Sequence, residues 1–514
     1  MTRFDSFRLE ADDALPRLAW CARIRRDASE AIVRHGPWVE HGDQSFYEGA
    51  WSGEAALSFD QALTFAGSGG RIDGDNIIFA TPTNTLEPLH LLQLAGELLC
   101  SNSIHFLLAE AGDAVSTDYP YYDGDMMTIM FGTHRHEPAV PTSSGNRVYQ
   151  YYHCNLVVSP DLSVTKQAKR TPPDFRNFED YSRFLFAEVA AITNNAMAPD
   201  RQVLYQPMAT ISSGYDSPAC AVIGRAAGCN EALTFTTARS NFEDREDSGA
   251  TIAKILGLNI TEFNYFSERP VRSDFPEAEF IATGHGGDDV VMNIIESVLP
   301  GRLLYTGYHG DKVWDKNNKK YGPHIVRGDT SGCSLAEFRL RTGFINLPVP
   351  FIGCLNHTSI HAISNLPEMA PWTLGNDYDR PIPRRIVEQA GVPRSLFGQK
   401  KKAITTPYQS NMGLNPPMEQ VLCEASYQDF MKFIEPIRQY ERLSYKLRYD
   451  LMHRLYGLNQ RAVWSGKLAR ALAMVGLERP SHVKVPFRFA KPRSNNFLAF
   501  HWAAEKMKRR YVRP

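Results

Sequence analysis

A short run of small, hydroxylated and acidic residues gives the clearest sign of chemistry in this sequence. Residues 211–218 read Ile-Ser-Ser-Gly-Tyr-Asp-Ser-Pro, between an apolar segment and a segment with helical spacing. Ser217 suits a helix N-cap and Pro218 the first helical position, so backbone N–H groups should face an anion there. Gly214 lets the backbone approach a ligand closely. Further donors are the hydroxyls of Ser212, Ser213 and Ser217.

The acidic residue Asp216 in this loop indicates which kind of anion could bind there. A carboxylate such as Asp216 would repel a phosphate unless a cation lies between them. Mg²⁺ is commonly bound by one or two carboxylates together with phosphate oxygens. The loop therefore predicts a magnesium–polyphosphate site, with Asp216 as a metal ligand. The alternative is that Asp216 only caps its own loop.

Strand and helix patterns alternate regularly on both sides of the loop. Strands are expected at residues 203–211, 232–237, 260–263 and 303–306. Helices are expected at residues 178–197, 218–227, 248–256 and 289–299. Gly228 and Gly257 stand where helix C-caps belong. This alternation predicts a doubly wound parallel sheet of the α/β class.

The rest of the chain divides near a proline-rich linker at residues 171–174. Before it, strand-like pieces predominate, with a short helix expected at residues 91–99. After about residue 340 the patterns are largely helical. We therefore expect a β-rich α+β domain over residues 1–175, and an α/β domain with a helical C-terminal part over residues 176–514.

Composition excludes several classes of protein. The 514 residues are 43% hydrophobic and 22% charged, with a formal net charge of −1, which gives no electrostatic case for nucleic acid. None of the eight cysteines forms a CxxC pair or zinc spacing, so free thiols are expected. No signal peptide or transmembrane segment is expected, and the predicted location is cytoplasmic. The basic stretch after residue 484 is either a solvated face or a patch for an anionic partner.

The loop resembles the S-G-G-x-D-S pattern of pyrophosphatase-loop (PP-loop) ATPases, with Ser213 in place of the first glycine. A following Thr-Phe-Thr strand end, an acidic stretch at residues 243–248 and Ala-Lys-Ile-Leu-Gly-Leu at residues 253–258 resemble the asparagine synthetase domain. This resemblance, over about residues 178–410, implies a HUP-like sheet that binds ATP and Mg²⁺. It implies nucleotide contacts at Ser212, Ser213, Gly214, Asp216, Ser217, Phe235, Gly307 and Gly310.

In the asparagine synthetase family a second loop, S-G-E-G-x-D-E, follows a later strand. Thr-Gly-Tyr-His-Gly-Asp-Lys at residues 306–312 is similar to it and implies that Asp311 shares the metal with Asp216. Tyr308 replaces the family's glutamate, and a lysine replaces the closing acid. Because tyrosine and histidine can transfer protons, Tyr308 and His309 are expected to be catalytic, with chemistry that differs from asparagine formation.

Two further segments bear on the site. Residues 283–289, Thr-Gly-His-Gly-Gly-Asp-Asp, either line the acceptor pocket, with His285 and Asp288 facing inward, or form a simple turn and helix cap. Residues 379–385 fall where the family has a lysine that neutralises pyrophosphate. Arg380 is the expected cation there, since its planar fork suits a phosphate; a surface charge is the alternative.

The resemblance implies a ligase without a glutaminase. Glutamine-dependent members begin with a nucleophilic cysteine after Met1, whereas this chain has Thr2, so its N-terminal domain resembles a degenerate Ntn amidotransferase. We expect an enzyme that activates a small-molecule or peptide carboxylate as an acyl-adenylate and joins it to an amine. Adenylation of a nucleobase or sugar for nitrogen or sulfur transfer, or inactive nucleotide binding, are the alternatives. The sequence is compatible with a homodimer.

Overall fold

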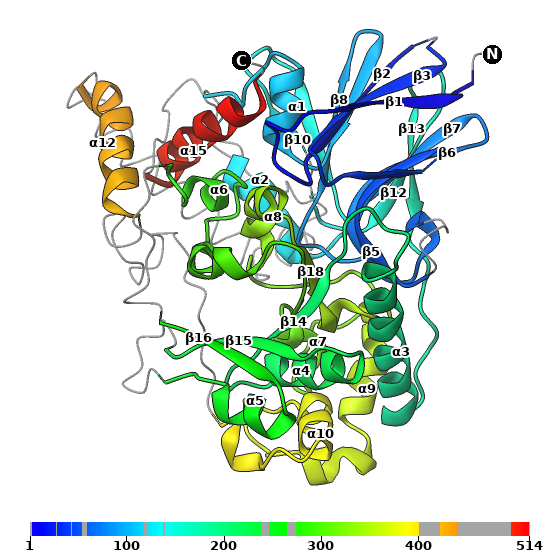
Figure 1. The fold of residues 1–514 in the computed structure, drawn as a ribbon, viewed down its shortest axis with the longest axis vertical. Coiled ribbons are helices and arrows are strands. Elements are labelled where there is room, and N and C mark those ends of the chain that lie inside the picture. Colours follow the sequence, from blue (N-terminus) through cyan, green and yellow to red (C-terminus); the bar gives the residue numbers. More distant parts are fainter. Residues whose placement is uncertain are drawn as a thin grey trace, which may run out of the picture.

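The computed structural model describes residues 3–26, 28–42, 44–53, 59–117, 119, 122–136, 139–237, 246–264, 274–399, 422–439 and 495–512. Two sheets from the N-terminal part lie at one end of the molecule, and a parallel sheet flanked by helices lies below them in Figure 1. The expected α/β composition with a β-rich N-terminal region is confirmed. None of the described helices is long and apolar enough to cross a membrane, and none of the eight cysteines, all of which are described, is in a disulfide.

The two N-terminal sheets pack face to face. The seven-stranded sheet contains β1 (Ser6–Ala11), β3 (Glu30–His35), β2 (Trp20–Arg25), β9 (Glu97–Ser101), β8 (Leu89–Leu94), β11 (Arg147–Tyr151) and β10 (Ala139–Pro141), in this order. The six-stranded sheet contains β13 (Val164–Ala168), β12 (Cys154–Val158), β7 (Asn76–Ala80), β6 (Phe65–Asp73), β5 (Ser45–Trp51) and β4 (Glu40–Gly42). Trp20 from one sheet stacks on Phe79 from the other, with ring centroids 5.9 Å apart. The two sheets thus share an apolar core.

The helix expected at residues 91–99 is wrong. These residues form the hairpin of β8 and β9, with Leu94 opposite Glu97. Leu91 and Leu98 belong to the core between the sheets, whereas Leu92 and Leu99 belong to a second core on the outer face. Because both faces of the hairpin are buried, its strands lack polar alternation and resemble a buried helix.

Helices from distant parts of the sequence cover that outer face. They are α1 (Ile104–Glu110), α6 (Ala278–Ile281) and α15 (Asn495–Tyr511), which lie together in Figure 1. Phe106 in α1 stacks on Tyr511 in α15 at 4.8 Å. The other described α-helices, apart from those that alternate with the strands of the parallel sheet, are α2 (Tyr122–Met126), α7 (Gly310–Val313), α8 (Ala336–Thr342), α9 (His357–Ser364), α10 (Pro381–Gln389) and α12 (Glu424–Gln439).

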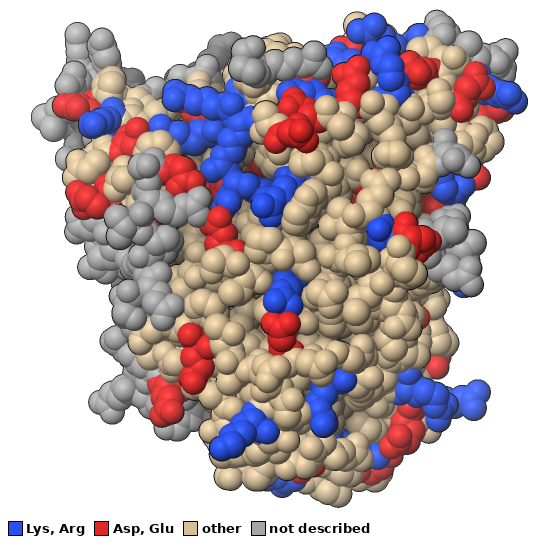
Figure 2. All heavy atoms as spheres, in the orientation of Figure 1, with Lys and Arg blue, Asp and Glu red and all other residues tan. Residues whose placement is uncertain are grey.

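The basic side chains of α15 contact other parts of this chain. Lys506 forms an ion pair with Asp429 at 2.5 Å, and Arg510 pairs with Glu279. Figure 2 shows basic and acidic atoms next to one another around this region, and scattered charges over the lower half of the same face. For the described part of the tail, the contacts favour an internal role for these charges over an anionic partner. The earlier basic residues of the tail, from 484 to 493, lie outside the described residues.

The third sheet is entirely parallel. Its order is β16 (Asn259–Phe263), β15 (Glu231–Phe235), β14 (Gln206–Thr210), β17 (Arg302–Thr306) and β18 (Ile345–Pro348). Between these strands run α4 (Asp216–Ala226), α5 (Ala250–Leu256) and the 3-10 helix η3 (Val290–Val298), after the long helix α3 (Phe178–Ala196). The predicted strand–helix alternation is therefore confirmed, with a 3-10 helix in place of the α-helix expected at residues 289–299.

The helix after the candidate phosphate loop begins earlier than the sequence predicts. α4 begins at Asp216, and its N-cap is Tyr215, which makes no side-chain capping bond. Ser217, the expected cap, lies in the first turn, where its hydroxyl is 2.9 Å from that of Ser212. This contact joins the beginning of the loop, Ser212, to the first turn of α4. The helix therefore includes Asp216 and Ser217, which the sequence assigned to the loop.

Candidate functional site

The two loops predicted to bind ATP follow neighbouring strands. The chain builds outward from β14 through β15 to β16, then returns to place β17 on the other side of β14. β14 and β17 pair in parallel, with Ala209 opposite Tyr305. Ligands of open α/β sheets bind at the carboxyl ends of strands where the order reverses in this way. The loop at residues 211–217 and the loop at residues 306–312 both leave the sheet at this point.

Hydrogen bonds fix the shape of the first loop. Ser213 donates from its hydroxyl to Asp247 Oδ1 at 2.6 Å, and its carbonyl accepts from the N–H of Gly398 at 2.8 Å. Gly214 N donates to Ser212 Oγ at 3.2 Å. Ser213 is not among the described residues with a positive φ, so serine meets no backbone strain where the family pattern has glycine. Asp247 is one of several acids in that stretch, and no pattern in the sequence distinguishes it from the others.

The second loop packs directly against Asp216. A Cβ added to Gly310 would lie 2.5 Å from Asp216 Cγ, and one added to Gly307 would lie 2.8 Å from Asp216 Cβ. Neither position accepts a larger residue without movement of the first loop. Gly307 and Gly310, which were expected to contact the nucleotide, are required for the close approach of the two loops.

The expected phosphate cation joins this centre. Arg380 is 5% exposed and forms an ion pair with Asp216. Burial alone would lower the pKa of the Arg380 guanidinium, but Asp216, and also Asp311, raise it above its usual range. Asp311 itself pairs with Lys312 at 2.9 Å. Asp216, Asp311 and Arg380, which come from distant parts of the chain, are therefore close enough for their charges to interact.

These groups fit magnesium and a polyphosphate. Two carboxylates, Asp216 and Asp311, are the oxygen ligands that Mg²⁺ prefers. The two glycines let the second loop, which carries Asp311, lie directly against Asp216. The guanidinium of Arg380 and the first turn of α4 supply positive charge for phosphate oxygens. The donor set is therefore suited to the pair of ligands expected from the sequence.

Tyr308 points away from this centre toward residues 283–289. Its hydroxyl lies 3.1 Å from Asp289 Oδ1. Asp289 is fully buried and also accepts from Gly332 N at 2.9 Å and Ser334 Oγ at 2.6 Å. Burial, and then Asp289, raise the pKa of the Tyr308 phenol well above its usual range, so it is a protonated donor in this state.

Asp289 is the residue of this segment that reaches a predicted catalytic side chain. His285 lies 3.2 Å from the hydroxyl of Tyr152, and Asp288 accepts from Thr330 at 2.6 Å. The two side chains expected to face the acceptor are thus bonded elsewhere. The sequence signal for Asp289 was available, since it is the second of two adjacent acids before a helix.

His309 has an unusual backbone for its residue type. Its φ is 72°, in the left-handed region that favours glycine, and the family pattern has a glycine at this place. Its ring stacks on Phe351 at 4.7 Å. Burial, and then the charge of Arg327, lower the pKa of His309 well below its usual range. The imidazole is therefore neutral at physiological pH, and strain at such a position is typical of functional sites.

Phe235 is at the carboxyl end of β15, the strand beside β14. Its side chain is 9% exposed, and its ring lies 6.2 Å from that of Phe263 in the neighbouring strand. It belongs to the apolar core that flanks the site. The adjoining residues 238–245, which include the acids Glu243 and Asp244, lie outside the described residues, as do the lysines at 400–402.

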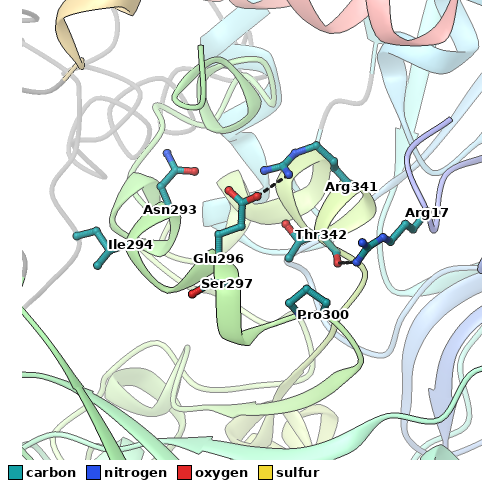
Figure 3. Close-up of a pocket in the computed structure, with 8 residues that line it drawn as sticks. All are labelled: Arg17, Asn293, Ile294, Glu296, Ser297, Pro300, Arg341 and Thr342. Atoms are coloured by element: carbon teal, nitrogen blue, oxygen red, sulfur yellow. Dashed lines mark hydrogen bonds and ion pairs between the residues drawn. The ribbon is translucent and has the colours of Figure 1, made fainter. Parts of the chain in front are cut away.

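A separate pocket of about 370 Å³ lies at the other end of the sheet. Its wall includes Pro300, just before β17, and Thr342, shortly before β18. Figure 3 shows Arg341 paired with Glu296 at 2.7 Å and Arg17 bonded to the Thr342 carbonyl at 2.8 Å. The predicted nucleotide residues do not line this pocket, because their loops follow the carboxyl ends of the strands.

No family model matches the chain, and a search of curated proteins also finds no match.

Proposed function

We propose that this protein is an ATP-dependent ligase that activates a carboxylate as an acyl-adenylate, releases pyrophosphate and forms an amide. One observation supports this most strongly. Asp216 is in contact with Gly307 and Gly310 from the second loop, and with Arg380, at the strand-order reversal of a parallel sheet. Nucleotide sites are typical of this position in such sheets.

The first half-reaction separates a negatively charged leaving group. The carboxylate substrate attacks the α-phosphorus of ATP, and the bond to pyrophosphate breaks. Mg²⁺, when bound by Asp216 and Asp311, supplies charge neutralisation for the polyphosphate. Arg380 binds pyrophosphate oxygens through its planar fork, in exchange for its present pairing with Asp216. Ser212 and Ser217 add hydroxyl donors from the first loop.

The second half-reaction needs a proton acceptor for the incoming amine. Tyr308 passes its proton to Asp289 and takes one from the amine as the new carbon–nitrogen bond forms. The ring of His309, the residue that follows Tyr308, is neutral and is a second group that can accept the proton of the amine. AMP leaves as the amide forms. In this proposal the amine is carried by a second substrate.

An inactive nucleotide-binding protein is the second candidate. It is favoured by the pairing of each predicted metal carboxylate with a cation of the chain, Asp216 with Arg380 and Asp311 with Lys312. Such pairs would have to open for a metal to bind. The ligase instead requires that Mg²⁺–ATP displaces both cations.

The experiment is ATP–pyrophosphate exchange against a panel of carboxylic acids, with amide products identified by mass spectrometry. Exchange with at least one acid is expected, and Asp216→Asn should reduce it by about 100-fold or more, because transition-state charge loses its stabilisation. Asp377→Asn changes an exposed acid in the nearby turn and serves as the control. Binding of Mg²⁺–ATP without exchange for any acid would favour the inactive protein. An Asp216→Asn variant with full exchange would refute the ligase site.

A further inference from the structure

Two chain segments enclose the Tyr308–Asp289 pair, and hydrogen bonds join them. The first is residues 282–289 and the second is residues 324–334. Asp288 accepts from Thr330 at 2.6 Å, and Asp289 N donates to Ser334 Oγ at 3.0 Å. Asp289 also accepts from Gly332 N and Ser334 Oγ. Any shift of either segment therefore moves the carboxylate that Tyr308 contacts.

The N-terminal sandwich and its helix hold the first segment. His105 in α1 lies with its Nε2 2.9 Å from the carbonyl of Ala282. Tyr152, in the turn between β11 and β12, places its hydroxyl 3.2 Å from His285 Nε2. Tyr152 is 6% exposed and His285 is 1% exposed. Gly284 packs against the sulfur of Met126, another residue of the N-terminal part.

The same part of the chain holds the second segment. Arg327, which is 1% exposed, donates from Nη1 to the carbonyl of Thr85 at 3.2 Å. The backbone N–H groups of Arg327 and Gly328 both donate to the carbonyl of Met130, at 3.0 and 3.1 Å. His324 accepts from the N–H of Thr133 at 2.8 Å. Both segments that carry the partners of Asp289 are thus fixed from the N-terminal side.

We propose that the N-terminal sandwich positions the Tyr308–Asp289 pair for amide formation, and that Tyr152 is a positioning residue for it. The inference rests on the proposed function for the reaction, but the positioning itself is a property of the fold. Tyr152 acts through His285: without the Tyr152 hydroxyl, Nε2 of His285 loses its hydrogen bond to the N-terminal sandwich. Loss of this buried bond loosens the segment that ends at Asp289. The N-terminal region therefore has a positioning role in the proposed ligase.

The test compares Tyr152→Phe with Tyr205→Phe. Tyr205 is also fully buried, but its hydroxyl has no hydrogen-bond partner among the described residues, so it controls for loss of a buried hydroxyl. In Tyr152→Phe, ATP–pyrophosphate exchange should stay within about two-fold of the native rate, since Asp216 and Arg380 are untouched. Amide formation should fall by about ten-fold or more, because small misplacements of reacting groups are costly.

Hydrogen–deuterium exchange supplies a second measurement on the full chain. In Tyr152→Phe, residues 282–289 should lose protection while residues 212–217 keep theirs, and Tyr205→Phe should change neither. Unchanged protection of residues 282–289, or equal losses of exchange and amide formation, would overturn the proposal. If the native protein catalyses neither half-reaction, the proposed ligase fails, and the protection of residues 282–289 alone decides the positioning.

Discussion

At the scale of single residues, the close approach of two loops depends on glycines that contact a carboxylate. Gly310 sits where a Cβ would lie 2.5 Å from Asp216 Cγ. Gly310→Ala should separate the loops and reduce ATP–pyrophosphate exchange by about ten-fold or more, because the two carboxylates proposed to bind Mg²⁺ lose their mutual placement. Gly53→Ala is the control, since its nearest neighbour would be an ordinary 3.4 Å away. Equal exchange rates in the two variants would contradict the role of Gly310.

Ser213 allows the opposite kind of change, since it stands where the family pattern has glycine. Its φ is not positive, and its hydroxyl donates to Asp247 at 2.6 Å. Ser213→Gly should therefore lower the free energy of unfolding by about 1 kcal/mol, through the lost bond and a more flexible unfolded chain. Urea denaturation measures this. A variant more stable than the native protein would show that the backbone at Ser213 is strained and that its hydrogen bond to Asp247 does not stabilise the fold.

At the scale of elements, α8 is tied to the N-terminal sandwich by a buried ion pair. Arg339 in α8 donates to Glu48 in β5 at 2.7 Å, with side-chain exposures of 3% and 0%. Arg339→Met would leave a buried carboxylate without its cation and should lower the free energy of unfolding by about 3–5 kcal/mol. Arg394→Met removes an exposed pair with Glu388 and should cost about 1 kcal/mol or less. Similar losses in thermal unfolding would contradict this reading of Arg339.

The sequence predicted some secondary-structure elements correctly and others wrongly. Alternation of apolar segments and capping glycines predicted the parallel sheet and its helices, because those signals are local. The hairpin of β8 and β9 was missed because burial of both its faces removed the alternation that identifies strands. For the candidate site, the sequence pattern singled out Asp216, Asp311 and Arg380, whose charges interact in the structure, but not Asp289 or Tyr152. Their roles depend on contacts between residues far apart in sequence, which no local pattern records.

At the scale of the whole molecule, several histidines are buried in the neutral form. Burial lowers the pKa of His285 and His357 to about 4, and that of His90 and His136 to about 3. Unfolding restores values near 6.5, so the unfolded chain binds more protons between pH 6.5 and 4. The free energy of unfolding is therefore not reduced by these histidines above pH 6.5, and it decreases as the pH falls below that value.

Among the described residues, the acids Glu87, Asp288 and Asp289 have the opposite effect in the same range, because burial raises their pKa values. The pKa of Asp288 rises to about 7, so its contribution to stability decreases as the pH rises from about 4 to 7. The buried histidines outnumber these acids, and the unfolding temperature should fall between pH 6.5 and 4. Calorimetry across that range measures this, and Asp288→Asn should make the acid-side decline steeper. An unfolding temperature that rises on acidification would contradict the buried neutral histidines.

The stacking of Phe106 on Tyr511 has a consequence for how the protein is made. Ribosomes synthesise the strands of the first sheet long before α15, yet α15 shields the outer face of that sheet. Arg34 in β3 even donates to the Tyr511 carbonyl, at 3.0 Å. During translation the nascent chain therefore carries an uncovered apolar surface until α15 emerges. Chaperones that bind such surfaces would find their longest opportunity here, before α15 is synthesised.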